Sequence, residues 1–273
     1  MKIGISTCSV LVKRFFPLLC LFYTSSALKA EDSSLVLGVG VGTLYYPSYI
    51  GSKTYNTLSL PLPYIRYKSD YLRIDEDGLS SNFLGINDLK IDLSLSGSLP
   101  ADSQNTSVRN GMPNLDLTGE VGFQLIYKIY ENTPYKLFFE TPLRAVLSTD
   151  FSNIAYRGII TNPQLKLSIN YQKYEWTFRS GLLFTDKVYN TYYYGVEKQY
   201  VTLQRSQYRT TGGFGGFRSR VGVSYKNNSW WAGAFISYYN INHAVFQDSP
   251  LVETKENVYL GGAIAYIFYT NGK

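Results

Sequence analysis

The chain has 273 residues, of which 16% are aromatic and 17% are charged, and it contains 23 glycines and carries a formal net charge of +6. Charged residues usually make up about a quarter of a soluble domain, so this composition excludes a disordered chain and an ordinary helical enzyme rich in alanine, leucine, glutamate and lysine. The excess of aromatic residues and glycine favours strands joined by turns.

Residues 1–30 have the pattern of a secretory signal peptide. A basic flank precedes the short apolar run 15–22, and small residues follow it. The run is shorter than the about 20 residues that span a bilayer as a helix. We therefore expect cleavage after Ala27 or Ala30, which leaves residues 31–273 as one domain.

Cleavage would change both the charge and the cysteine content. It removes four cations and no anion, so that the net charge falls from +6 to +2. A nucleic-acid-binding function then loses its electrostatic basis. Cys8 and Cys20 also leave, so the mature chain has no thiol and forms no disulfide. We expect its stability to come from a large core or from a closed barrel.

Apolar and polar residues alternate through most of the mature chain, which is the period of a β-strand. In the segment 89–96 every second residue is leucine or isoleucine, and the segments 164–171 and 174–182 repeat the alternation. The candidate strands in chain order are 35–45, 57–68, 70–77, 79–86, 88–99, 116–130, 135–147, 163–171, 174–184, 213–226, 229–240 and 257–268.

A soluble β-sandwich also shows such alternation, but three features favour a membrane barrel. Alternating runs reach the ~9–11 residues that a tilted spanning strand needs, aromatic residues recur near the run ends, and the opposite faces carry charges that suit a wet interior. We therefore predict an all-β fold, a transmembrane antiparallel up-and-down β-barrel of about 12 strands embedded in outer-membrane lipid.

The connections alternate between short and long from residue 100 onward. The short ones are predicted to be periplasmic turns, and the long ones, 100–115, 148–162, 185–212 and 241–256, to be outer loops. The strand pattern is weakest over residues 69–87. If this stretch forms a hairpin, the barrel has 12 strands, and if it forms a periplasmic excursion, the barrel has 10.

Several motifs follow one another in a characteristic order. They are Leu37–Gly42, Tyr46–Gly51, Leu60–Ile65, Arg109–Leu115, Gly119–Gly122, Tyr193–Val196 and Ser249–Val252. In this order and spacing the chain resembles the MipA/OmpV family of Gram-negative outer-membrane proteins over essentially its whole mature length. The R-x-G-M-P-x-L and S-P-L-V stretches are the most specific parts of the resemblance.

The resemblance implies a barrel in the cell outer membrane that works as a non-catalytic scaffold. Its implied partners are a lytic murein transglycosylase and a bifunctional murein synthase, which such a scaffold brings together. Other members of the family resemble adhesins or are linked to osmotic response and antibiotic uptake. No catalytic residues carry over from the family.

The candidate functional residues fall into two groups. One group belongs to the family motifs: Arg109, Gly111, Met112, Pro113, Ser249 and Pro250. The other is expected to face the interior of the barrel: Glu120, Arg179, Arg218 and Arg220. Arg109 could anchor its loop, fold inward and pair with Glu120, or contact a partner. Tyr49 and the run Tyr192–Tyr194 are expected to belong to an interfacial aromatic belt or to bind a ligand.

The sequence supports neither catalysis nor a cofactor. His243 is the only histidine and lies in a predicted loop, and with no cysteine only carboxylates remain for a metal. The glycines at 212–216 lack the Gly-Lys-Ser and the helix of a phosphate loop. Two alternatives to the scaffold stay open, a narrow pore for small solutes and a surface adhesin that acts through tyrosine-rich outer loops.

Overall fold

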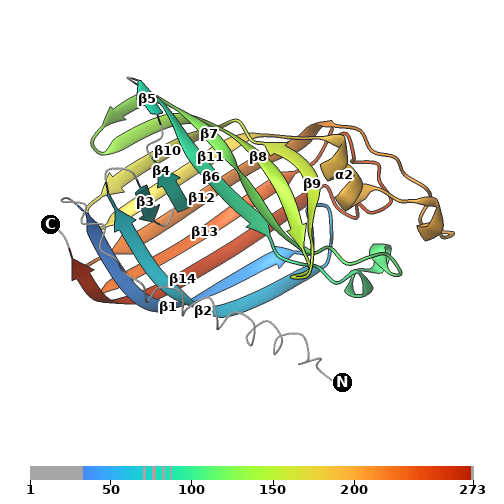
Figure 1. The fold of residues 1–273 in the computed structure, drawn as a ribbon, viewed down its shortest axis with the longest axis horizontal. Coiled ribbons are helices and arrows are strands. Elements are labelled where there is room, and N and C mark those ends of the chain that lie inside the picture. The colour runs from blue at the N-terminus through green and yellow to red at the C-terminus, as the bar shows by residue number, and fades with distance from the viewer. Residues whose placement is uncertain (1–32, 70–71, 76–77, 82–83, 87, 272–273) are drawn as a thin grey trace.

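The computed structural model describes residues 33–69, 72–75, 78–81, 84–86 and 88–271, which form one antiparallel β-sheet with short helices at one end (Figure 1). The predicted signal peptide 1–30 lies outside the described residues. The elements are β1 (Ser34–Pro47), β2 (Tyr55–Lys68), β3 (Leu72–Asp75), β4 (Gly78–Ser81), β5 (Leu84–Ile86), β6 (Leu89–Ser98), η2 (Ser103–Asn105), η3 (Ser107–Arg109), β7 (Leu117–Asn132), β8 (Tyr135–Thr149), β9 (Ile154–Thr161), β10 (Gln164–Tyr171), β11 (Tyr174–Thr185), α2 (Lys187–Tyr194), η4 (Lys198–Tyr200), β12 (Gly213–Lys226), β13 (Trp230–Asn240) and β14 (Glu256–Asn271).

Neighbouring strands in the sheet are mostly neighbours in sequence, as an up-and-down meander requires. The order is β4-β3-β2-β1-β14-β13-β12-β11-β10-β8-β7-β6-β5. The first and last long strands, β1 and β14, pair from Leu35↔Asn271 to Tyr45↔Leu260. Figure 1 shows the long strands curving around a common interior, with the short turns at one end and the long loops and α2 at the other.

The two faces of the sheet differ as the alternation predicts. On β14 the outward side chains Leu260, Ile264 and Phe268 are 42%, 47% and 60% exposed, whereas Ala265 and Ile267 on the inner face are buried. The other long strands repeat the pattern, with exposed outward residues such as Val39, Val41, Phe123, Leu143, Leu165, Trp176 and Ile236. The outer face is therefore a broad apolar surface.

In the stretch 69–87 we expected the strands 70–77 and 79–86. The described residues there, 69, 72–75, 78–81 and 84–86, include three strands of three or four residues. β3 pairs with β2 only at Tyr67 and Lys68, and β5 pairs with the first residues of β6. These strands are far shorter than the ~9–11 residues that cross a bilayer.

The predicted outer loop 148–162 is wrong in extent, because β9 occupies most of it. β8 pairs first with β10, from Ile169↔Tyr135 to Gln164↔Glu140, and then with β9 from Leu143↔Thr161 onward. β9 and β10 thus form one long run that is interrupted only at 162–163.

Pro61 and Pro63 lie inside β2, and β2 keeps an unbroken register with β1 through both residues, without a bulge. In the described part of the chain, β2 pairs only with β1 from Tyr55 to Arg66. It is an edge strand there, and an edge tolerates the missing N–H of proline.

Among the described residues no helix is long and apolar enough to cross a membrane. The largest hydrophobic core lies at the loop end of the sheet, where residues of the long loops meet inner-face side chains such as Val146, Leu183 and Tyr239.

Candidate functional site

The loops 48–54, 99–116, 186–212 and 241–255 pack together at one end of the interior, and we call them the loop cap. The α2 residue Tyr194 lies at its centre, stacked on Phe246 with ring centroids 3.8 Å apart and planes 5° apart. The hydroxyl of Tyr194 donates to the carbonyl of Ile50 over 2.9 Å, and that of Tyr49 donates to the carbonyl of Leu251 over 2.6 Å. The cap therefore has its own core, assembled from three separate loops and a helix.

Asp186 begins α2 by accepting a hydrogen bond from the Tyr189 backbone N–H at 2.8 Å, as an N-cap residue does. Gly158 of β9 faces this helix start with φ +107°, and a Cβ there would collide with Asp186 and with the Tyr189 backbone. Glycine at this position lets the helix lie directly against β9.

The belt that we expected for Tyr49, Tyr193 and Tyr194 is wrong, since all three are buried in the cap. Burial raises the pKa of the Tyr49 phenol and raises the pKa of Tyr193 to about 12. Burial disfavours the charged form of a phenol. These tyrosines therefore stay neutral and are structural parts of the cap.

Arg109 fixes the cap from inside. It is 3% exposed. Its guanidinium donates to the Tyr193 carbonyl at 3.0 Å, to the Pro113 carbonyl at 3.2 Å and to Ser103 Oγ at 3.2 Å. The same group lies 5.6 Å from the centroid of the Tyr49 ring. Arg109 thus joins its own loop to α2.

The other family-motif residues lie in the same cap. Gly111 has φ +81° and turns the chain so that Met112 donates its N–H to the Arg109 carbonyl at 2.9 Å. Ser249 Oγ donates to the Tyr194 carbonyl at 2.7 Å, and Pro250 follows it directly. The two most specific motifs of the sequence therefore both contact the C-terminal end of α2.

The inner wall below the cap carries buried ion pairs. Arg144 Nε donates to Glu120 Oε2 at 2.8 Å, and its Nη1 donates to Ser94 Oγ at 3.2 Å. Glu120 thus pairs with Arg144 rather than with Arg109. Sequence reasoning missed Arg144, although its inward position in the alternation of the 135–147 strand could have indicated it.

Glu140 is the centre of a second polar cluster on the inner wall. It accepts a hydrogen bond from Gln164 Nε2 at 2.9 Å, and Lys166 and Arg179 lie 3.9 Å from its oxygens. The guanidinium groups of Arg218 and Arg220 lie 5.2 Å and 3.8 Å from the rings of Tyr239 and Phe235. The cations expected from the alternation therefore line the interior.

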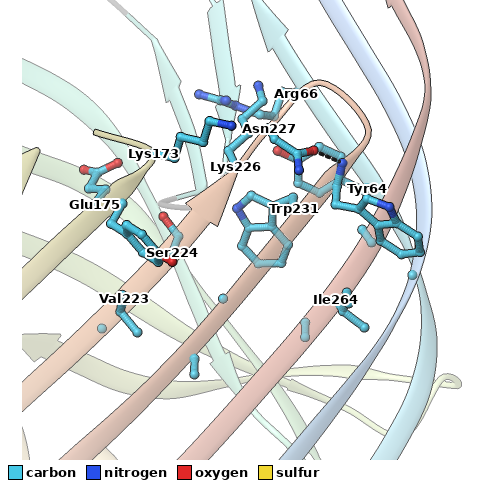
Figure 2. A pocket seen from close by; sticks show the side chains of 18 of the residues that line it. Tyr64, Arg66, Lys173, Glu175, Val223, Ser224, Lys226, Asn227, Trp231 and Ile264 are labelled. Atoms are coloured by element: carbon cyan, nitrogen blue, oxygen red, sulfur yellow. Dashed lines mark hydrogen bonds between the residues drawn. The ribbon is translucent and has the colours of Figure 1, made fainter. Parts of the chain in front are cut away.

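At the short-turn end the interior is open and forms a cavity of about 1130 Å³. Its wall comes from β1, β2 and β10–β14 and from the turns at 172–173 and 227–229. Figure 2 shows Trp231 near its middle, with the basic side chains of Arg66, Lys173 and Lys226 gathered toward the turns.

Residues 39–268 match the family described as MltA-interacting protein MipA. The chain belongs to the MipA family. No curated protein sequence matches it.

Among solved structures the chain is similar to the translocator domain of the autotransporter NalP from Neisseria meningitidis, with 10% identity, 96% of each chain covered and a TM-score of 0.36. The outer-membrane protease OmpT from Escherichia coli shares 10% identity over 91% of this chain and 99% of its own, with a TM-score of 0.29. A Pseudomonas aeruginosa FadL homologue shares 8% over 88% and 91%, with a TM-score of 0.33.

In this MipA-family chain the described residues contain no group of three or more His, Cys, Asp or Glu side chains that could hold a metal ion. His243 is exposed, and its backbone N–H donates to Gln247 Oε1 at 2.9 Å.

Proposed function

We propose that this MipA-family protein is a β-barrel of the outer membrane, with its short turns in the periplasm and its loop cap outside. The apolar outer face supports this placement. Near the short turns that face carries exposed aromatic side chains, namely Tyr130, Tyr135, Tyr171, Tyr174, Trp230 and Tyr266. Such a belt is typical of a membrane interface. The proposal also requires that the edge strand β2 be covered by the other end of the sheet, because lipid offers its backbone no hydrogen-bond partners.

Its role is that of a non-catalytic scaffold that holds a murein synthase and a lytic transglycosylase near each other at its periplasmic rim. Family membership is the first support, since the family is described by its interaction with MltA. The observation that carries the proposal is the difference between the two ends. The loop end is filled by its own hydrophobic core, whereas the turn end is open.

The same difference counts against a pore, because a through-channel would have to pass the stacked rings of Tyr194 and Phe246. An adhesin keeps one specific observation in its favour. Leu203 in the loop 195–212 is wholly exposed, and its neighbour Val201 is 44% exposed, so the outer end presents a small apolar tip that a partner could cover.

Site-specific photo-crosslinking in whole cells tests the scaffold. A crosslinking residue placed at Asn132, the last residue of β7, or at Asn228, in the short turn before β13, should capture the synthase and the transglycosylase. The same residue at Asn153 or Gln199, both exposed near the loop end, should capture neither. Capture from the loop end alone, or from no position, would refute the scaffold. A steady conductance in planar bilayers would favour the pore instead.

A further inference from the structure

The open cavity at the turn end has a floor of small residues that leaves room for a ligand. Gly40 of β1 and Ala263 and Ala265 of β14 line it. A side chain at Gly40 would collide with the backbone of β14. The volume of about 1130 Å³ lies slightly above the roughly 300–1,000 Å³ that is usual for small-molecule sites. The cavity is thus a consequence of which inner positions hold small side chains.

One wall of the cavity is aromatic. Trp231 and Tyr64 lie with ring centroids 5.3 Å apart and planes tilted by 32°. Phe235 lies on the same inner face of β13, four residues after Trp231 in the sequence. The Arg220 guanidinium lies 3.8 Å from its ring centroid. Flat aromatic faces contact the apolar faces of rings in a ligand.

The remaining wall is mainly cationic. Among the described residues, five basic side chains line the cavity, Arg66, Lys173, Arg179, Arg220 and Lys226, together with one carboxylate, Glu175. Arg179 also lies 3.9 Å from Glu140. Cations that gather in a concave site attract anions.

We propose that this cavity binds a glycan that bears carboxylates. The proposal rests on the proposed function for the compartment into which the cavity opens. The aromatic wall takes the sugar rings, the cations take the carboxylates, and the amides of Asn170 and Gln172 in the lining both donate to and accept from hydroxyls. An acyl chain would fit poorly, because acyl chains need an apolar tunnel and this wall is charged and open.

The test uses the purified protein in detergent and two β-linked N-acetylglucosamine-containing probes of similar length. Hyaluronan tetrasaccharide carries carboxylates, and chitotetraose carries none. Trp231 is the tryptophan whose side chain faces the interior (Figure 2). Trp176 is 42% exposed and lies outside the cavity lining, whereas Trp230 borders the cavity but is 45% exposed and packs against the outward ring of Tyr266, with ring centroids 5.3 Å apart. The protein with Trp176→Phe and Trp230→Phe therefore reports binding through Trp231 fluorescence alone.

We expect the acidic tetrasaccharide to bind at least tenfold more tightly than the neutral one. The effect of single variants is measured by calorimetry in the otherwise native chain. Trp231→Leu and Lys226→Gln should each weaken the affinity for the acidic tetrasaccharide by about tenfold. Trp176→Leu and Arg209→Gln are the matched controls, an exposed tryptophan outside the cavity lining and an exposed cation in the loop cap. They should leave the affinity unchanged.

Equal binding of the two probes would overturn the proposal, and so would equal weakening by the control variants. Tetraglutamate is the third probe: if it binds as tightly as the acidic glycan, the aromatic wall plays no part and the site takes acidic peptides instead. These measurements contain no murein enzyme. If the glycan does not bind but the turn-end crosslinks form, the glycan proposal is refuted and the scaffold proposal stands. If the glycan binds but the crosslinks do not form, only the scaffold proposal is refuted.

Discussion

The Glu120–Arg144 pair offers a direct test of the interior, because both side chains are less than a tenth exposed and 2.8 Å separates Arg144 Nε from Glu120 Oε2. Two unit charges about 4 Å apart attract by about 4 kcal/mol at an effective dielectric constant of about 20. Removal of one partner from a buried pair typically costs 3–5 kcal/mol, because the other charge stays buried. Since Glu120→Gln keeps the shape and an acceptor for Arg144, we expect it to lower the free energy of unfolding by about 3 kcal/mol.

The assay is urea unfolding of the protein in detergent micelles, followed by tryptophan fluorescence, for Glu120→Gln, Arg144→Met and the double variant. With a slope of about 2 kcal/mol per molar urea, the single variants should lower the midpoint by 1 M or more. The double variant should recover most of this loss, because no unpaired charge remains. Glu131→Gln is the control, since its pair with Lys136 is 2.8 Å long but more than a third exposed on both sides and should matter little. A coupling energy below about 0.5 kcal/mol would refute the reasoning.

Three further outcomes follow from the loop cap. Arg109→Ala removes three hydrogen bonds to the cap and should make loop 186–212 cleavable by protease, whereas Arg209→Ala at an exposed position should not; equal cleavage of both would contradict the anchor. Burial raises the pKa of Tyr193 to about 12 against about 10 in an unfolded chain, so its contribution is complete below pH 10 and is lost as the pH rises toward 12. The unfolding free energy should therefore fall less between pH 9 and 11 in Tyr193→Phe than in the native chain. Leu203→Ser should abolish host-cell adhesion if the adhesin alternative holds and should leave the turn-end crosslinks unchanged.

The strands and the faces of the sheet could be predicted from the sequence because both follow from a period of two residues. Arg179, Arg218 and Arg220 occupy alternate positions, and the structure places all three on the inner wall. The segment 154–161 escaped prediction because its pairing with β8 shifts register between Ala145 and Leu147. A one-residue shift exchanges the two faces of a strand and erases the alternation.

The loop cap could not be predicted in the same way. Arg109 and the Tyr193 carbonyl are 84 residues apart in sequence, and Ser249 and the Tyr194 carbonyl are 55 apart. Such contacts depend on the folded path of three loops, and no local period encodes them. The family motifs contain residues that lie in the cap, but they gave no sign that the tyrosines beside them are buried rather than placed at a membrane surface.

The two ends of the molecule differ in the size of the side chains that face the interior and in whether loops fold into it. At the loop end the inner wall is lined by larger side chains such as Val146, Leu183 and Tyr239, and the loops bring further aromatic rings against them. Toward the turn end the cavity is lined by small inner residues of β1 and β14, namely Gly40, Ala263 and Ala265, and the turns are too short to fold inward. Replacement of Ala263 by phenylalanine would therefore be expected to reduce the cavity without touching the cap. Loss of glycan binding in Ala263→Phe with normal protease resistance of loop 186–212 would show that the two ends are independent, whereas loosening of the cap would show that they are coupled.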